Sequence, residues 1–264
     1  LDFSAGIIDE CLVYNNGFYD CNDSGATGFY ISLGMAISSN GQYGYLTKYT
    51  GGANVCSLNS ISGRWSACMD SGATTVANSA SSIVLNPQGT YAYLINQNNN
   101  VYICSVNING TLSACALATS LTYSFANTLN AAGTYLYVGS NMCSVNTITG
   151  ALTNCVDNGS GIADAYGMAL NALGTGAYIA DRTNTIWKCS VNTITGMLSG
   201  CVDSGAGISF NARSITVSGS YAYVGDDGSQ VYQCAINPST GNLSGCTSVY
   251  TSAGYVTQII ISQY

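Results

Sequence analysis

An all-β repeat fold is predicted by three features of this 264-residue sequence. Twelve cysteines fall into six pairs, and the pairs recur about every 45 residues, which is the sign of an internal repeat. Each repeat contains four short β-prone runs, and glycine stands in the turns between them. Four-stranded units of about 40–50 residues are typical of propeller blades. The sequence therefore predicts a six-bladed β-propeller with four-stranded blades, in a single domain.

The cysteine segments predict the two outer strands, c and d, of each blade. Residues 143–155 read CSVNTITGALTNC and residues 189–201 read CSVNTITGMLSGC, and the other repeats are related. A glycine five residues before the second cysteine fits a hairpin turn that needs positive φ. Such a hairpin brings both cysteines onto adjacent antiparallel strands, close enough to form a disulfide. Metal binding is the alternative, but the close C-x2-C spacing of zinc sites is missing. The predicted disulfides are Cys11–Cys21, Cys56–Cys68, Cys104–Cys115, Cys143–Cys155, Cys189–Cys201 and Cys234–Cys246.

The segment before each cysteine hairpin predicts the two inner strands, a and b. Examples are GMAISSNGQYGYLT (34–47) and SIVLNPQGTYAYLI (82–95), which are two β-prone runs around a turn. Alternate tyrosines of strand b, such as Tyr91 and Tyr93, share one face, and we expect them to pack between neighbouring blades. The strand-a aliphatic residues expected in register are Ile37, Leu85, Leu129, Leu170, Ile215 and Ile259.

The two ends of the chain are expected to complete the first blade together. LDFSA (1–5) fits the end of a strand b, and YVTQIIISQY (255–264) fits a strand a. The same strand could instead add to the blade of a neighbouring subunit. The expected blades are 1–25 with 255–264 for blade 1, then 33–72, 81–118, 126–160, 166–205 and 212–248 for blades 2 to 6.

The strand-b segments YLTK, YLIN, YVGS, YIAD and YVGD resemble the repeats of bacterial YVTN or lactonase-like β-propellers. The resemblance extends over essentially the whole chain and implies the propeller fold. It implies little about function, because propellers carry binding, scaffolding and catalytic functions. A cysteine pair in every blade, and six blades rather than seven, depart from the usual pattern of that family.

Charge excludes several classes of function. Only 6% of the residues are charged, with 5 Lys and Arg, 12 Asp and Glu, and no histidine, whereas about 25% is ordinary. Five scattered cations do not make a nucleic-acid surface, and histidine catalysis or imidazole metal ligation is impossible. No apolar run is long enough for a membrane-spanning helix. Six disulfides predict an oxidising compartment, so we expect a secreted or cell-surface protein whose signal peptide has been removed.

Four aspartates share one repeat position, two residues after the second cysteine: Asp23, Asp70, Asp157 and Asp203. In the sequence Asp-Ser-Gly we expect an Asx-turn, in which the carboxylate accepts backbone N–H groups. The alternative is a partial acidic ring for Ca²⁺, although calcium takes six to eight oxygens. The pair Asp226–Asp227 is a second, weaker calcium candidate. No other cofactor is expected.

Catalysis is not expected, because the predicted channel positions hold one charged residue, Arg213, and no converging acids. The resemblance to lactonases carries no catalytic residue across. The favoured function is a non-catalytic extracellular structural or adhesive propeller that associates with itself in a surface filament or matrix, or that binds an extracellular glycan or protein. A carbohydrate-binding, lectin-like propeller is the alternative, because tyrosine offers both an apolar ring and a hydroxyl. A lactonase-like hydrolase is the third hypothesis.

Overall fold

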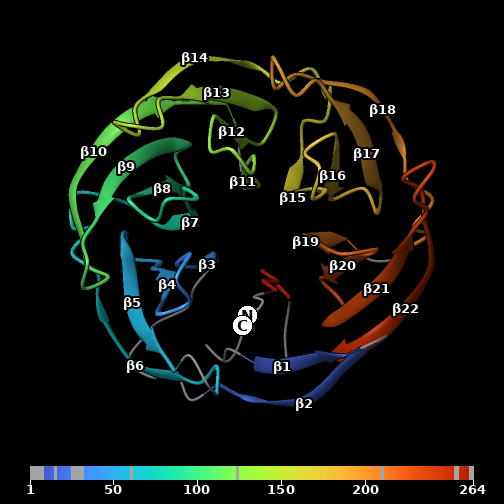
Figure 1. The fold of residues 1–264 in the computed structure, drawn as a ribbon, viewed down its shortest axis with the longest axis horizontal. Helices are drawn as coiled ribbons and strands as arrows, with labels where there is room; N and C mark the ends of the chain where they lie inside the picture. Colours follow the sequence, from blue (N-terminus) through green and yellow to red (C-terminus); the bar gives the residue numbers. More distant parts are fainter. Residues whose placement is uncertain are drawn as a thin grey trace.

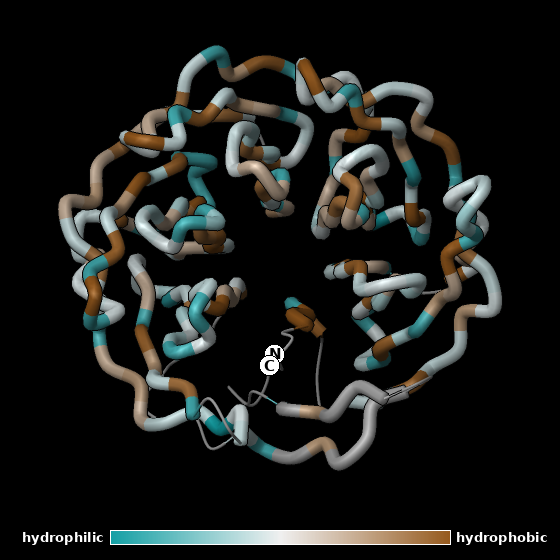
Figure 2. Tube along the Cα trace, in the orientation of Figure 1, coloured by the Kyte–Doolittle hydropathy of each residue, from teal (hydrophilic) through white to brown (hydrophobic). Residues whose placement is uncertain are grey.

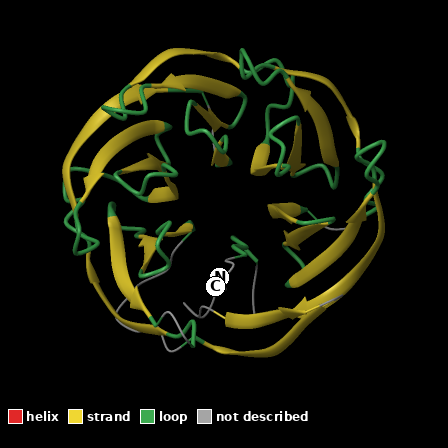
Figure 3. Ribbon diagram, viewed as in Figure 1, coloured by secondary structure: helices red, strands yellow, loops and turns green. Residues whose placement is uncertain are grey.

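The β-prone runs form strands arranged in a ring. The computed structural model describes residues 9–14, 17–24, 33–59, 62–122, 125–208, 211–252 and 256–261. Within these ranges the chain forms 22 β-strands and no helix (Figure 3). The strands are grouped in antiparallel sheets around a central axis, with strand a of each sheet innermost and strand d at the rim (Figure 1). The prediction of an all-β propeller is confirmed.

Five of the sheets have four strands, so the predicted number of six four-stranded blades is wrong. Blade 2 consists of β3 (Met35–Ile37), β4 (Tyr43–Thr47), β5 (Ala53–Leu58) and β6 (Trp65–Asp70). Blade 3 consists of β7 (Ala80–Leu85), β8 (Tyr91–Asn96), β9 (Asn100–Val106) and β10 (Leu112–Ser120). Blade 4 consists of β11 (Asn127–Leu129), β12 (Tyr135–Val138), β13 (Asn141–Val145) and β14 (Leu152–Asp157). Blade 5 consists of β15 (Ala165–Leu170), β16 (Gly176–Asp181), β17 (Ile186–Val191) and β18 (Leu198–Asp203). Blade 6 consists of β19 (Ala212–Ser218), β20 (Tyr221–Asp226), β21 (Gln230–Ile236) and β22 (Leu243–Thr251).

The sixth position in the ring holds the first repeat, whose described part is a two-stranded sheet of β1 (Asp9–Tyr14) and β2 (Gly17–Asp23). Residues 1–5, expected to belong to strand b of this blade, lie outside the described residues. The C-terminal segment was expected as strand a, yet Val256 forms a single bridge and residues 257–261 form no strand. The first repeat is therefore not a four-stranded blade in the described part of the chain.

The C-terminal segment is held by side-chain packing rather than by the hydrogen bonds of a strand ladder. The Val256 N–H donates to the Asp226 carbonyl at 3.2 Å. The Val256 side chain packs on Gly225, since a Cβ added to Gly225 would lie 2.4 Å from the Val256 Cγ1. Val256 and Ile259 join a buried cluster with blade 6, whereas Ile260 packs against a cluster of blade 2. The segment thus contacts both blades that flank the sixth position, near the axis (Figure 1).

Disulfides staple the outer hairpins. All six predicted cysteine pairs are joined, with Cα atoms 4.0–4.1 Å apart. The turn glycine of each described hairpin has the positive φ expected of it, between 71° and 80°; these are Gly63, Gly110, Gly150, Gly196 and Gly241. Closing a loop of about a dozen residues stabilises each hairpin by roughly 2–3 kcal/mol in the chain-entropy model.

A buried tyrosine of strand b links each blade to the next. The hydroxyls of these clamp tyrosines donate to the carbonyl of the turn glycine in the following blade at 2.7–2.8 Å; the pairs are Tyr45 with Gly110, Tyr93 with Gly150, Tyr137 with Gly196 and Tyr178 with Gly241. Burial raises the pKa of Tyr45, Tyr93 and Tyr137 to about 12. The neighbouring tyrosine on the same face stacks on the same glycine, since a Cβ on Gly110 would lie 2.6 Å from the Tyr43 ring.

The hydrophobic core lies between blades rather than within one layer. One buried cluster joins blades 2 and 3, a second joins blades 3 and 4, a third joins blades 4 and 5, and a fourth joins blades 5 and 6. Apolar segments lie along the inner strands and in the C-terminal segment, and others alternate with polar segments around the rim (Figure 2). Blade-to-blade packing of this kind orients every strand a toward the axis, and that arrangement positions the candidate site.

Candidate functional site

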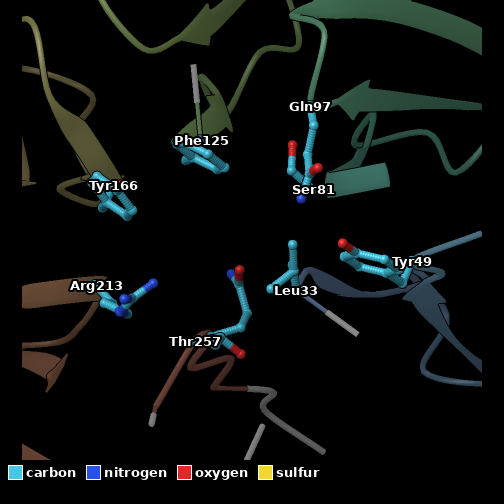
Figure 4. Close-up of a pocket in the computed structure, with 9 residues that line it drawn as sticks. Leu33, Tyr49, Ser81, Gln97, Phe125, Tyr166, Arg213 and Thr257 are labelled. Carbon is cyan, nitrogen blue, oxygen red and sulfur yellow. The ribbon is translucent and has the colours of Figure 1, made fainter. Parts of the chain in front are cut away.

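Side chains from every four-stranded blade converge on a pocket at the axis of the ring (Figure 4). Its volume is about 250 Å³. The lining residues are Leu33, Tyr49, Ser81, Gln97, Phe125, Tyr166, Arg213, Thr257 and Gln258. Most of them stand at the start of a strand a or just after a strand b, so the pocket lies on the face of the ring that carries the b–c loops.

Three of these side chains stand at β-bulges. The pairing of strands a and b skips one residue in blades 3, 5 and 6, and the extra residues are Ser81, Tyr166 and Arg213. A bulge leaves one residue out of the ladder and re-aims its side chain, and bulges are frequent beside binding sites. In blades 2 and 4, strand a is only three residues long, and Leu33 and Phe125 lie just before it.

The five strand-a residues of the pocket occupy one equivalent position of the repeat. In blades 2 to 5, one aliphatic residue of strand a pairs with the strand-b residue that in turn pairs with the first cysteine of the blade. These aligned residues are Ile37, Leu85, Leu129 and Leu170. In blade 6 the aligned residue is Val217, so the predicted Ile215 is wrong by two residues. The a–b turn of blade 6 is two residues shorter than that of blades 2 and 3, and this difference explains the error in the predicted register. Each strand-a pocket residue lies four positions before its aligned aliphatic residue.

An aromatic pair and the Arg213 guanidinium line one side of the pocket, and the Arg182 guanidinium lies beside Tyr166. The rings of Phe125 and Tyr166 stack with centroids 4.9 Å apart and planes inclined by 15°. The Cζ atoms of Arg182 and Arg213 lie 5.2 and 5.6 Å from the Tyr166 ring centroid. Cations at such distances are attracted by the negative face of the ring. Tyr166 is therefore fixed by contacts with a neighbouring ring and with two cations.

The positive charge of Arg213 is balanced by an acid. Its guanidinium forms an ion pair with Asp227, in which Nε and Nη2 each contact one carboxylate oxygen. The Asn211 amide donates to the same carboxylate at 3.3 Å. The side chains of the pair are 27% and 22% exposed, so the fork-shaped contact is partly shielded from water. The result is a planar group at the pocket wall that offers both donors and acceptors.

Small residues beneath the pocket allow the inner strands to approach closely. A Cβ on Gly34 of blade 2 would lie 2.6 Å from the Ser82 Cα of blade 3. A Cβ on Gly167 would lie 2.8 Å from the backbone of Ser214. Side chains larger than hydrogen at these two positions would force the blades apart, so the width of the ring depends on them.

The four aspartates of the acidic repeat position lie in four different repeats. Three of the carboxylates accept the N–H of the glycine two residues later at 2.7–2.8 Å; they are Asp70, Asp157 and Asp203. Burial alone would raise the pKa of Asp70, but hydrogen bonds from Lys48 and from the Gly72 N–H hold it below its usual value. Asp23 is exposed at the end of β2. Among the described residues no three cysteine or acidic side chains are grouped as metal ligands.

The residue after each of these aspartates connects two repeats. The carbonyls of Ser71, Asn158 and Ser204 accept the N–H of the first residue of strand d in the following blade, at 2.6–2.8 Å. The Ser24 carbonyl accepts the Trp65 N–H in the same manner at 3.1 Å. We call these four hydrogen bonds between repeats the latches; at Ser71, Asn158 and Ser204 the Asx-turn formed by the preceding aspartate holds the latch carbonyl in place. This structural role accounts for the repeated Asp-Ser-Gly sequence.

The second acidic candidate divides into two separate roles. Asp226 is fully buried, and one of its oxygens accepts the Gln230 N–H at 2.8 Å, which holds the b–c loop of blade 6. Asp227 turns toward the axis and pairs with Arg213. The two carboxylates therefore act on different partners.

A second surface feature lies on the opposite face, at the tips of the c–d hairpins. Ile108, Ile148 and Ile194 occupy the same turn position in blades 3, 4 and 5 and are 100%, 85% and 84% exposed. Leu173, in the a–b turn of blade 5, is 81% exposed on this same face. Large exposed apolar side chains that recur by the symmetry of the ring are unusual on a surface, and groups of them mark interaction sites. We call these four residues the apolar tips.

The sequence analysis did not identify the pocket residues Phe125 and Tyr166, or Arg182 beside them, because the channel positions it predicted in blades 4 and 5 lie two or three residues further along strand a. The predicted register of strand a holds in these two blades, so counting four residues back from Leu129 and Leu170 would have led to Phe125 and Tyr166. Arg213 was expected at the channel, whereas Asp227 was expected as a weak calcium candidate in a b–c loop and not as the ion-pair partner of Arg213. The bulges had no signal in the sequence.

The fold is similar to that of several solved structures. A candidate 6-phosphogluconolactonase from Bacteroides uniformis aligns with a TM-score of 0.62 at 13% identity, covering 85% of this chain and 73% of that one. A candidate 6-phosphogluconolactonase from Bacteroides fragilis has a TM-score of 0.63 at 15% identity, covering 88% and 72%. A functionally unknown protein from Desulfotomaculum acetoxidans has a TM-score of 0.62 at 15% identity, covering 94% and 78%.

These similarities show the β-propeller fold and no more, because the identities are so low. No protein-family model matches the sequence, and no curated protein matches it. In the described part of the chain, no helix has the length and apolar character required to cross a bilayer. Six disulfides are typical of proteins from an oxidising, extracellular environment.

Proposed function

We propose that this protein is a non-catalytic, extracellular structural propeller that associates with other copies of itself. The observation that carries the proposal is the set of apolar tips, with one nearly fully exposed isoleucine at the same position of three consecutive blades. A chain with 6% charged residues has little electrostatic repulsion between copies to oppose such contact. A second copy is therefore the partner whose surface chemistry best suits this face.

The energy available from the tips sets the strength of that contact. Full burial of one isoleucine side chain contributes about 1.5–3 kcal/mol, so the three isoleucines together contribute about 5–9 kcal/mol. Losing the free motion of two molecules costs about 4–15 kcal/mol. A single pair of copies is accordingly weakly bound, and an array in which each copy has several neighbours is stable. A surface filament or matrix has that property.

Replacing the three tip isoleucines by threonine tests the proposal. The turns already contain threonine at neighbouring positions, so we expect Ile108→Thr, Ile148→Thr and Ile194→Thr together to leave the melting temperature unchanged. Sedimentation and negative-stain microscopy should then show particles smaller than those of the wild type. The matched control replaces three exposed apolar residues of the outer strands, Met69, Val156 and Val202, by threonine. Equal particle sizes for wild type and tip variant would refute the proposal.

The terminal segment offers a specific mode of association. Residues 256–261 are held mainly by side-chain packing at the sixth position of the ring, and such a segment could complete a blade of a neighbouring copy instead. Deletion of residues 255–264 should then reduce particle size even with the apolar tips intact. An unchanged multimer would exclude strand exchange and leave association through the tips as the mechanism.

A lactonase-like hydrolase is the second candidate, and it rests on the fold shared with the two Bacteroides proteins. The pocket lining offers Arg213, paired with Asp227, and otherwise neutral polar and apolar groups. Incubation of the protein with 6-phosphogluconolactone and with simple lactones, with and without Ca²⁺, decides between the candidates. Turnover that is lost in Arg213→Gln would replace the structural proposal by a catalytic one.

A further inference from the structure

We infer that the axial pocket is a binding site for a neutral monosaccharide unit, in addition to the contacts made by the apolar tips. Its volume of about 250 Å³ is slightly below the roughly 300–1,000 Å³ of pockets for drug-sized ligands. The space is therefore suited to one small ring rather than to a peptide or a long acyl chain. The five lining residues of strand a stand at one repeat position, so they reach the axis at a similar depth.

The chemistry of the lining is suited to a polyol. Side-chain amides are supplied by Gln97 and Gln258, and hydroxyls by Tyr49, Ser81 and Thr257. Amides and hydroxyls both donate and accept hydrogen bonds, as sugar hydroxyls do. Leu33 and Phe125 provide apolar surface for the C–H groups of a ring. Few polar groups placed among apolar walls are the usual composition of a small-molecule site.

Charge favours a neutral ligand over an anion. Among the described residues that line the pocket, Arg213 alone is charged, and its ion pair with Asp227 cancels that charge locally. Arg182 lies beside Tyr166 but is exposed and is not part of the lining. The net charge of the chain is −7, which repels anions at long range. An acidic sugar would have to compete with Asp227 for the guanidinium.

The asymmetry of the pocket is the strongest argument for a specific ligand. Structural positions of the repeat hold nearly the same residue in each blade, as the clamp tyrosines and turn glycines do. The pocket position instead holds an aliphatic residue, a hydroxyl, two aromatic rings and a cation in turn: Leu33, Ser81, Phe125, Tyr166 and Arg213. Five different groups at one repeat position remove the rotational symmetry of the site, so an asymmetric ligand such as a sugar is held in one orientation rather than in several equivalent ones.

The test is calorimetric titration of the protein with methyl glycosides of glucose, galactose, mannose, fucose and N-acetylglucosamine, with gluconate and glucuronate as the anionic probes. We expect millimolar binding of at least one neutral glycoside and none of the anions. Two variants probe the pocket: Gln97→Ala removes one amide at an exposed position, and Phe125→Leu removes the aromatic face while keeping apolar volume. Each should weaken binding about three- to tenfold.

Gln88→Ala is the matched control, because Gln88 lies in the a–b turn of blade 3 on the opposite face, and it should bind like the wild type. The melting temperature of every variant verifies folding before titration. Binding only of gluconate or glucuronate would overturn the inference of a neutral ligand. Binding that is unaffected by both pocket variants would place the site elsewhere, and a folded wild type that binds none of the probes would overturn the inference altogether. Particle size, measured separately, reports on self-association independently of these outcomes.

Discussion

The clamp tyrosines are predicted to stabilise the contact between blades, and Tyr137 is the clearest case. Its side chain has no exposed surface, and its hydroxyl donates to the carbonyl of buried Gly196 in the next blade at 2.7 Å. Tyr137→Phe removes this donor and keeps the ring. A buried carbonyl deprived of a donor costs about 1–3 kcal/mol. We therefore expect the free energy of unfolding to fall by that amount.

The expected shift in melting temperature follows from the size of the chain. Unfolding 264 residues releases an entropy of about 0.55 kcal/mol/K at the usual value per residue. A loss of about 1–3 kcal/mol thus lowers the melting temperature by about 2–5 °C. Scanning calorimetry with all disulfides intact measures this shift. The control is Tyr49→Phe, whose side chain is 56% exposed and which should melt within about 1 °C of the wild type.

Two results would refute the reasoning on the clamps. If Tyr137→Phe melts within about 1 °C of the wild type, the hydrogen bond between the blades contributes nothing net. If Tyr49→Phe is destabilised as much as Tyr137→Phe, the effect belongs to tyrosine hydroxyls in general and not to the contact between blades.

Three further predictions concern the latch and the titration of the clamps. Gly159 and Gly161 both have positive φ, but only at Gly159 would a Cβ meet a carbonyl, that of Leu198 at 2.6 Å. Gly161→Ala should lower the melting temperature by about 2 °C and Gly159→Ala by about 5 °C or more; equal shifts would refute the steric role of the latch. Asp157→Asn keeps an oxygen that accepts the Gly159 N–H, so the melting temperature of this variant should match that of the wild type. Ca²⁺ should raise the melting temperature of neither protein; a rise with Ca²⁺ in the wild type alone would indicate a metal site. The pKa of three clamp tyrosines is raised from 10.0 to about 12, so their contribution to the free energy of unfolding is complete below pH 10 and is lost as pH rises through 12. Denaturant titrations across this range, with tyrosinate absorbance followed in parallel, should show the stability of the protein falling. A denaturation midpoint that stays constant from pH 10 to pH 12 would contradict this prediction.

The sequence was sufficient to predict the elements that repeat. Cysteine spacing predicts the outer hairpins, and the turn glycines have the expected positive φ, because each depends on local geometry within about a dozen residues. The tyrosine spacing predicts strand b and its packing against the next blade. These positions obey the same physical demand in every blade, so five versions of the same signal reinforce one another.

The elements that occur once were predicted poorly. The first repeat was expected to be a four-stranded blade, but residues 257–261 form no strand, since their apolar side chains are divided between blades 2 and 6. The register of blade 6 was wrong because its a–b turn is two residues shorter than in blades 2 and 3. Bulges depend on how two strands coil around the axis, which a periodic pattern does not encode.

The same distinction between repeated and unique positions separates stability from function in this molecule. Disulfides, latches and clamps recur around the ring and link each repeat internally or to the next, so the fold does not depend on surface ion pairs. In the described residues the two ion pairs are Lys48–Asp70 at an exposed edge and Arg213–Asp227 at the pocket. The second of these joins a bulge to a b–c loop in one blade only, beside the stacked rings of Phe125 and Tyr166. Charge is scarce in this chain, and a charge pair retained at the axis, where all blades meet, is better explained by recognition of a ligand than by stability.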